Sequence, residues 1–263
     1  MRITKLDVIK LSQAYGDQDR WRFSGGTVDV WNTVLVRLTA EDGTTGLGEI
    51  GDGHFLPESA ESLATFCSRM LGDLSVFDTN LLYDRLYKAG HFWGRRGMAL
   101  GVISGIETAC WDIQGKLLGQ PLYRLLGGAY RSKLRVYASG GMEKSDAELA
   151  DELKRHVADG FTAVKIRGGY PNPARDEQLM ALARDAVGAD IDVAIDAGQG
   201  YVPRPWSIKK AIEAVRRLNP YRPMWLEEPV RTDDVAGYAE IRAAADFPIA
   251  GGENLSGLVE ARP

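Results

Sequence analysis

The stretch Ile191-Asp192-Val193-Ala194-Ile195-Asp196-Ala197-Gly198-Gln199-Gly200 decides the fold of this 263-residue chain. A short strand-like run ends in an acid, and a glycine-rich turn follows at once. Two later segments repeat the design, Met224-Trp225-Leu226-Glu227-Glu228-Pro229 and Pro248-Ile249-Ala250-Gly251-Gly252-Glu253. The acids at 196, 227 and 253 recur at intervals of about one strand–helix unit. We therefore expect their carboxylates at the same end of successive parallel strands.

Three carboxylates that converge on one place repel each other, so they would hold protons unless a cation lay between them. Ligation by oxygen atoms alone suits a hard divalent ion, Mg²⁺ first. The sequence therefore predicts that Asp196, Glu227 and Glu253 are metal ligands. The alternative, three solvated loop acids, does not account for their common register.

The composition is that of an ordinary globular protein, with 44% apolar and 26% charged residues. A net charge of −4 without a basic stripe argues against nucleic-acid binding. No apolar run approaches the roughly 20 residues that span a bilayer, and the first residues lack the apolar segment of a secretory signal. We expect Cys67 and Cys110 to be buried, reduced thiols and the protein to be cytoplasmic.

The first 130 residues predict an α+β domain. Alternating runs indicate strands at 3–10, 33–39 and 44–50, the last two joined by an Asp-Gly turn. A polar, aromatic loop is expected over 15–28. Helical spacing follows at 58–71, 80–89 and 98–118, where apolar residues step by three and four positions until Gly119.

From residue 131 to 263 strands and helices alternate, which favours a parallel α/β sheet or barrel. Strands are expected at 134–139 and 161–167 and before Asp196, Glu227 and Glu253. Helices are expected from a capping box at Ser145 and over 173–187, 207–218 and 233–245. A TIM-type (β/α) barrel needs eight such strands and five are present, so we expect the last third to be missing. An open doubly wound sheet is the alternative, but it would gather ligands at a switch point between strands.

One segment carries a family resemblance. Gly105-Ile106-Glu107-Thr108-Ala109-Cys110-Trp111-Asp112-Ile113-Gln114-Gly115-Lys116, followed by Gly119-Gln120-Pro121-Leu122-Tyr123-Arg124-Leu125-Leu126-Gly127-Gly128, resembles the linker helix of the enolase superfamily, mandelate racemase/muconate lactonizing subgroup. The three strand-end acids match that subgroup's Asp–Glu–Glu magnesium ligands. The resemblance implies that residues 1–130 are a capping domain whose mobile loops close over a barrel. It also implies a small carboxylate substrate, a homo-oligomer, and abstraction of the proton α to a carboxylate, with Mg²⁺ stabilising the enediolate.

The second predicted barrel strand departs from the subgroup's usual pattern. Relatives often end this strand in Lys-x-Lys, with the second lysine as base, whereas this chain has Lys165-Ile166-Arg167. Arg167 stays protonated, so it suits carboxylate binding or enediolate stabilisation better than proton abstraction. Lys165 would orient the substrate, or act as base if its neighbours depress its pKa. The His–Asp pair that many relatives carry on later strands would lie beyond Pro263.

Other residues are candidates for substrate contact. The resemblance places His54 and the pair Trp21 and Arg22 on loops that select the substrate. Gln199 follows the Asp196 strand, and Glu228 adjoins a predicted ligand and would hydrogen-bond beside the metal. For each of these, an ordinary exposed or structural role is the competing interpretation.

The resemblance and the Gly94-Arg95-Arg96-Gly97 loop favour a Mg²⁺-dependent dehydratase that converts a sugar acid to a 2-keto-3-deoxy acid. A racemase, epimerase or cycloisomerase is the first alternative, and a truncated, non-catalytic member is the second. We expect a chain that ends at Pro263 to be inactive, because an unclosed barrel exposes sheet edges and apolar core.

Overall fold

The computed structural model describes residues 1–16, 20–23, 26–92, 94–258 and 260–261, without the side chains of residues 21–23. The chain divides into two compact units. The first comprises residues 1–18, 29–132 and 256–263, and the second residues 19–28 and 133–255. Each unit has its own apolar core.

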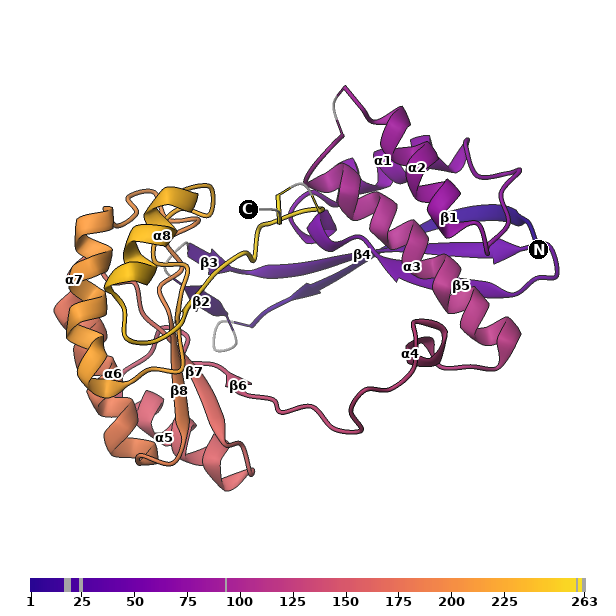
Figure 1. Ribbon diagram of the computed structural model, residues 1–263. Coiled ribbons are helices and arrows are strands. Elements are labelled where there is room, and N and C mark those ends of the chain that lie inside the picture. Colours follow the sequence, from indigo (N-terminus) through magenta and orange to yellow (C-terminus); the bar gives the residue numbers. More distant parts are fainter. Residues whose placement is uncertain (17–19, 24–25, 93, 259, 262–263) are drawn as a thin grey trace. The chain divides into compact units, whose positions relative to one another are not determined.

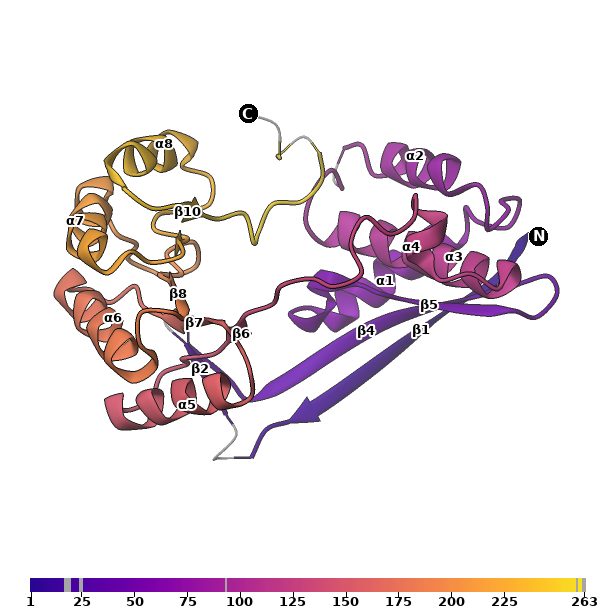
Figure 2. The same cartoon turned by 60° about the horizontal axis from the view of Figure 1, so that its bottom comes forward.

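The first unit is a three-stranded antiparallel sheet with helices on one face (Figure 2). The strands lie in the order β1-β4-β5. Their bounds are β1 (Ile3–Ala14), β4 (Val30–Ala40) and β5 (Thr45–Glu49). The helices are η1 (Gly51–His54), α1 (Pro57–Ser68), α2 (Thr79–Ala89), α3 (Met98–Leu118) and α4 (Leu122–Leu125). Alternate residues of β4, among them Val34, Val36 and Leu38, are fully buried against the helices.

Helix α3 lies against β5 closely enough for backbone to meet backbone. Its apolar residues at 99, 103, 106, 110 and 113 are buried, as their spacing predicts. It ends where Gly119 adopts a left-handed conformation with φ 60°. A Cβ added to Gly48 of β5 would lie 1.9 Å from the carbonyl oxygen of Gly105 in α3. Glycine at these positions therefore allows the helix and sheet to pack.

The second unit is a parallel sheet whose helices cover one side (Figure 1). Its strands lie in the order β10-β9-β8-β7-β6. They are β6 (Ala138–Ser139), β7 (Ala163–Arg167), β8 (Asp192–Asp196), β9 (Leu226–Glu227) and β10 (Ile249–Ala250). The helices are α5 (Asp146–Ala158), α6 (Pro173–Val187), α7 (Ile208–Leu218), η2 (Asn219–Tyr221) and α8 (Val235–Ala244). The arrangement is that of consecutive β/α units of a barrel.

Two local expectations are wrong. The segment expected as a loop over 15–28 contains a short hairpin of β2 (Trp21–Phe23) and β3 (Gly26–Val28), which pair antiparallel. The strand expected over 134–139 is only two residues long, because only Ala138 and Ser139 pair with β7. Leu134 and Val136 before it are exposed, so their alternation with polar residues does not mark a buried strand face.

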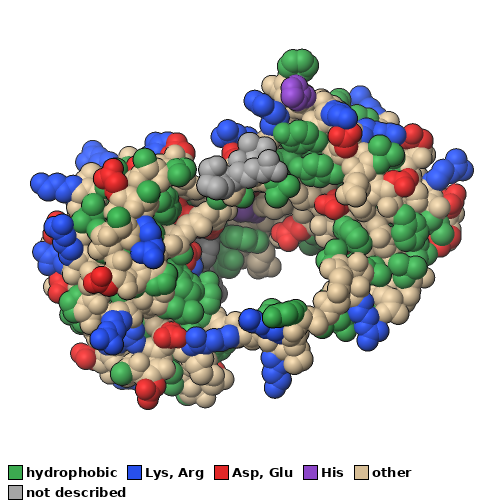
Figure 3. Space-filling view, in the orientation of Figure 1, with side chains coloured by type: hydrophobic (Ala, Val, Ile, Leu, Met, Phe, Trp, Pro, Cys, Tyr) green, Lys and Arg blue, Asp and Glu red, His purple; other side chains and the backbone are tan. Residues whose placement is uncertain are grey.

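The cysteines, the surface charges and the helices agree with what the composition predicts. Cys67 and Cys110 are free and buried, and burial raises the pKa of their thiols to about 11 and about 12. On the face shown in Figure 3, acidic and basic side chains are interspersed over both units. None of the helices in the described residues has the length and hydropathy of a membrane span.

Candidate active site

The carboxyl ends of the parallel strands bring Arg167, Asp196 and Glu227 to one edge of the second unit. Arg167 at the end of β7 is the register partner of Asp196 at the end of β8. Asp196 is in turn the partner of Glu227 at the end of β9. Neighbouring strands lie about 4.8 Å apart, so these three side chains start from adjacent positions. The regular register explains why a spacing of one strand–helix unit in the sequence becomes proximity in space.

Lys165 joins the two acids. Its Nζ donates hydrogen bonds to Glu227 Oε1 and Oε2 at 2.9 and 3.1 Å and to Asp196 Oδ2 at 3.3 Å. The lysine is buried, and burial alone would lower the pKa of its ammonium. The hydrogen bond to Glu227 and the charges of both carboxylates outweigh that effect, so the pKa is raised. Lys165 is therefore held as a cation between two strand ends.

Arg167 forms the second ion pair of the site. Its guanidinium contacts Asp196 Oδ2, while Asp196 Oδ1 accepts a hydrogen bond of 3.0 Å from the backbone N–H of Gly198. Asp196 is only 1% exposed, and this burial raises the pKa of its carboxyl, although the neighbouring guanidinium opposes the rise. Arg167 Nε is buried and has no hydrogen-bond partner among the described residues. The guanidinium thus retains a donor that the site does not use.

Glu228 is a fully buried carboxylate whose two oxygens bind the turn after β10 and the segment that follows β9. Its Oε1 accepts from the backbone N–H groups of Gly252 at 2.7 Å and Glu253 at 3.3 Å. Its Oε2 accepts from Thr232 Oγ1 at 3.1 Å and Tyr238 OH at 3.0 Å. Its backbone has φ 48°, an uncommon conformation for a residue with a side chain. Glu228 therefore anchors the turn after β10 that contains Glu253.

Glu253 itself has an exposed side chain three residues beyond β10. Across the described part of the chain, no three His, Cys, Asp or Glu side chains are arranged as a metal-binding group. The structure therefore brings Asp196 and Glu227 together around Lys165 and anchors the backbone of Glu253 at the same sheet edge. The assignment of the three acids as a ligand set stays a prediction.

Gln199 ties together the loops that follow β7 and β8. Its Nε2 donates to the carbonyl oxygens of Gly169 at 3.1 Å and Ala197 at 2.7 Å. Its Oε1 accepts from the backbone N–H of Trp206 at 2.8 Å, and the residue is 1% exposed. Both amide hydrogens are thus occupied by backbone. These contacts describe a loop-positioning role, and its predicted contact with substrate stays a prediction.

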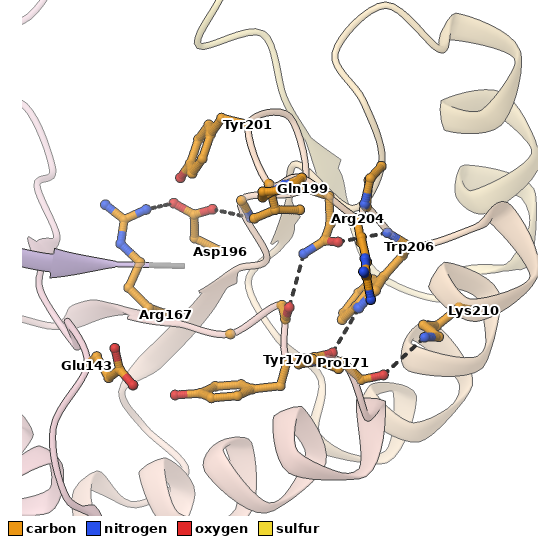
Figure 4. A pocket seen from close by; sticks show the side chains of 16 residues that line it. Glu143, Arg167, Tyr170, Pro171, Asp196, Gln199, Tyr201, Arg204, Trp206 and Lys210 are labelled. Atoms are coloured by element: carbon orange, nitrogen blue, oxygen red, sulfur yellow. Dashed lines mark hydrogen bonds and ion pairs between the residues drawn. The ribbon is translucent and has the colours of Figure 1, made fainter. Parts of the chain in front are cut away.

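A cavity of about 690 Å³ opens beside the Arg167–Asp196 pair (Figure 4). This is within the size range of small-molecule pockets. Its wall includes Glu143, Tyr170, Tyr201, Arg204, Trp206 and Lys210. Burial raises the pKa of the Tyr201 hydroxyl to about 12, so this side chain is a neutral phenol at the cavity wall. A cavity reaching a cation–carboxylate pair can accommodate a small polar acid.

Asp176 is a buried acid that the sequence analysis did not single out. It lies in the first turn of α6, and its Oδ1 accepts a hydrogen bond from the backbone N–H of Gly169. Its Oδ2 is buried without a partner in the described part of the chain. Burial raises the pKa of this carboxyl to about 7, against the hydrogen bonds from the loop and the charge of Arg175. Acids are common in first helical turns, so the sequence carries no signal of this environment.

The remaining candidates lie elsewhere. His54 belongs to the first unit, where its ring stacks on Trp31 and its Nδ1 lies 2.6 Å from the carbonyl oxygen of Gly51. The side chains of Trp21 and Arg22 fall outside the described residues. The predicted roles of these three residues in substrate binding therefore stay predictions.

Two parts of the chain match known families of protein domains. Residues 12–127 match the family described as "Mandelate racemase / muconate lactonizing enzyme, N-terminal domain". Residues 148–263 match "Enolase C-terminal domain-like".

The chain belongs to the mandelate racemase/muconate lactonizing enzyme family of the enolase superfamily. This confirms the resemblance, and the two matched regions correspond to the α+β part and the parallel-sheet part.

Relatives within the family include sugar-acid enzymes. The chain is 39% identical to an arabinonate dehydratase from Saccharolobus solfataricus over 84% of its own length and 58% of the relative's. It is 34% identical to a D-galactarolactone cycloisomerase from Agrobacterium fabrum over 85% of its length and 58% of the relative's. It also resembles the crystal structure of a racemase from Streptomyces coelicolor with bound magnesium, at 28% identity and a TM-score of 0.84. That match covers 98% of this chain and 71% of the racemase.

The chain thus spans a little over half the length of the two curated relatives.

Proposed function

We propose that Asp196, Glu227 and Glu253 hold Mg²⁺ and that the protein dehydrates a sugar acid to a 2-keto-3-deoxy acid. The observation that carries the proposal is the register of β8 and β9, which makes Asp196 and Glu227 neighbours at the carboxyl ends of the strands. Family membership and the dehydratase among the relatives support the reaction class. The cycloisomerase among the relatives supports the alternative, which begins with the same α-proton.

The donor set fits the metal by its chemistry. The three residues offer carboxylate oxygens only, the donors that Mg²⁺ prefers. Glu228 contributes by fixing the backbone of Glu253, so its removal would loosen one ligand without removing a donor. When bound, Mg²⁺ acts as a Lewis acid that polarises a substrate carboxylate and increases the acidity of its α-proton.

Lys165 and Arg167 bring positive charge to the same end of the sheet. The ammonium of Lys165 donates hydrogen bonds to Glu227 and Asp196. We therefore propose that it orients these carboxylates and does not abstract the proton. Arg167 stays protonated and lies at the cavity, where its guanidinium can bind the substrate carboxylate. The α-proton passes to the His–Asp pair that the family resemblance implies as base. The β-hydroxyl then takes up a proton and leaves as water, and the enol that remains tautomerises to the 2-keto acid.

Metal binding is tested on the chain itself by isothermal titration with MgCl₂. We expect one site for the parent chain and at least a tenfold weaker site for Asp196→Asn, because one charged ligand is lost. The matched control is Asp192→Asn, which removes an acid at the opposite end of β8 and only an exposed ion pair with Arg135. Equal affinity in all three proteins would remove Asp196 from the ligand set.

The reaction is tested with the protein, MgCl₂ and a library of aldonic and aldaric acids in D₂O. Formation of a 2-keto acid with deuterium at C3 is the expected result. Interconversion of hydroxy-acid stereoisomers without water loss would instead identify a racemase or epimerase. Ring closure or opening of a lactone would identify a cycloisomerase.

A further inference from the structure

The cavity beside Asp196 has two chemically different ends (Figure 4). One end contains the Arg167–Asp196 pair at the strand termini. The other contains Arg204, from the loop after β8, and Lys210, from the first turn of α7. The aromatic side chains of Tyr170 and Trp206 form part of the wall.

The end of the cavity formed by Arg204 and Lys210 carries positive charge, and no acidic residue of the cavity wall neutralises it. Arg204 is exposed and makes no ion pair or hydrogen bond with any other residue that the structure describes. Lys210 Nζ donates to the carbonyl oxygen of Pro171 at 3.1 Å, which is a neutral acceptor and uses one of its three hydrogens. The acids of the lining are Glu143 and Asp196, and Figure 4 shows both on the Arg167 side, away from Lys210.

The framework beneath Arg204 is buried and hydrogen-bonded. Trp206 is 5% exposed, its backbone N–H donates to Gln199, and its Nε1 donates to the carbonyl oxygen of Tyr170 at 2.8 Å. The same Gln199 bonds the loop after β7. The hydrogen bonds of Trp206 therefore hold the backbone two residues after Arg204. This limits the backbone entropy that is lost when the Arg204 guanidinium binds a ligand.

We propose that Arg204 and Lys210 bind a second anionic group of the substrate, at the end remote from the reacting carboxylate. This rests on the proposed function, which places the reacting carboxylate beside Asp196. The group is the distal carboxylate of an aldaric acid or the phosphate of a phosphorylated aldonic acid, since a guanidinium forms paired, charge-assisted hydrogen bonds with either. A neutral hydroxymethyl end, as in an aldonic acid, offers these cations no charge.

The test is isothermal titration of the chain, in excess MgCl₂, with three six-carbon acids of the same configuration: the aldaric acid, the 6-phosphoaldonic acid and the aldonic acid. We expect at least one of the two acids that carry a second anionic group to bind at least tenfold more tightly than the aldonic acid. This difference in affinity should shrink as NaCl rises, because exposed charge pairs are screened. The acid with the larger difference identifies whether a carboxylate or a phosphate occupies the subsite.

Two variants separate the subsite from a general effect of charge. Arg204→Met should remove the tighter binding of the acid with a second anionic group and change aldonic acid affinity less than twofold. Arg216→Met removes an exposed charge from α7 that does not line the cavity, and should change neither affinity. Equal binding of the three acids by the parent, or equal losses for all three in Arg204→Met, would overturn the subsite alone. Failure of the parent to bind any sugar acid would overturn the proposed function as well.

Discussion

Asp176 is the residue whose burial has the clearest consequence for stability. Its pKa is raised from 3.8 to about 7 in the folded chain, mainly by desolvation. Between these values the folded state holds a proton that the unfolded state has released. The contribution of Asp176 to stability is therefore fully present below about pH 4 and is lost as the pH rises toward 7.

We expect Asp176→Asn to remove this pH dependence. The amide resembles the protonated carboxyl in shape and still offers an oxygen to the N–H of Gly169. Because each pKa unit corresponds to about 1.4 kcal/mol, the variant should gain a few kcal/mol over the parent between pH 4 and pH 7.5. Urea unfolding followed at both pH values measures the difference. A constant difference between variant and parent would show that Asp176 does not titrate in this range.

Single residues show where sequence reasoning reaches its limit. The positions of Asp196 and Glu227 at adjacent strand ends follow from chain spacing, because parallel strands impose a regular register. The roles of Gln199 and Glu228 do not, because each depends on which backbone N–H and carbonyl groups converge on a buried side chain. Asp176 and Arg204 were missed for the same reason. An acid in a helix and an arginine in a loop are ordinary until their surroundings are known.

At the scale of elements, the contact of β5 with α3 depends on glycine. A Cβ at Gly48 would lie 1.9 Å from the Gly105 carbonyl oxygen and 2.9 Å from the Ala109 nitrogen, and helix backbone cannot yield as a flexible side chain can. Gly48→Ala should therefore lower the free energy of unfolding by about 3 kcal/mol. Gly72→Ala, where no heavy atom lies within 4 Å, is the control and should stay within about 0.5 kcal/mol. Comparable stability of the two variants in urea would contradict the close approach.

The start of α5 tests a feature that was predicted from sequence and is confirmed. Ser145 accepts from the Glu148 backbone N–H at 3.3 Å, and the Glu148 carboxylate accepts from the Ser145 N–H at 2.9 Å. Ser145→Ala should cost about 1 kcal/mol, whereas Ser145→Thr keeps a hydroxyl and should cost less. Urea unfolding measured by circular dichroism compares them. A threonine variant as unstable as the alanine variant would argue against the cap.

Local signals of this kind explain why the elements were predictable. The helices at 98–118 and 173–187 begin and end where spacing, glycine and proline indicate. The hairpin of β2 and β3 and the shortness of β6 were not foreseen. Three-residue and two-residue strands are too short to show a period, so their existence depends on pairing partners.

At the scale of the whole molecule, the chain has two apolar cores that share no residue. One is built from β4, α1, α2 and α3, and the other from the parallel strands and α5 to α8. All three predicted ligands of Mg²⁺ belong to the second unit. A ligand that binds only the folded form stabilises the cooperative unit that contains its site, by about 2.7 kcal/mol at a hundred times its Kd.

We therefore expect Mg²⁺ to slow amide hydrogen exchange in β7, β8 and β9 and to leave β4 and α3 unchanged. Local opening reports the stability of each cooperative unit separately, so a metal held at the strand ends protects those strands first. Exchange measured by mass spectrometry, with and without MgCl₂, gives the protection of each peptide, and Asp196→Asn should abolish the effect. Equal protection of β4 and β8 would show that the two cores open together, and protection that persists in Asp196→Asn would place the ion elsewhere.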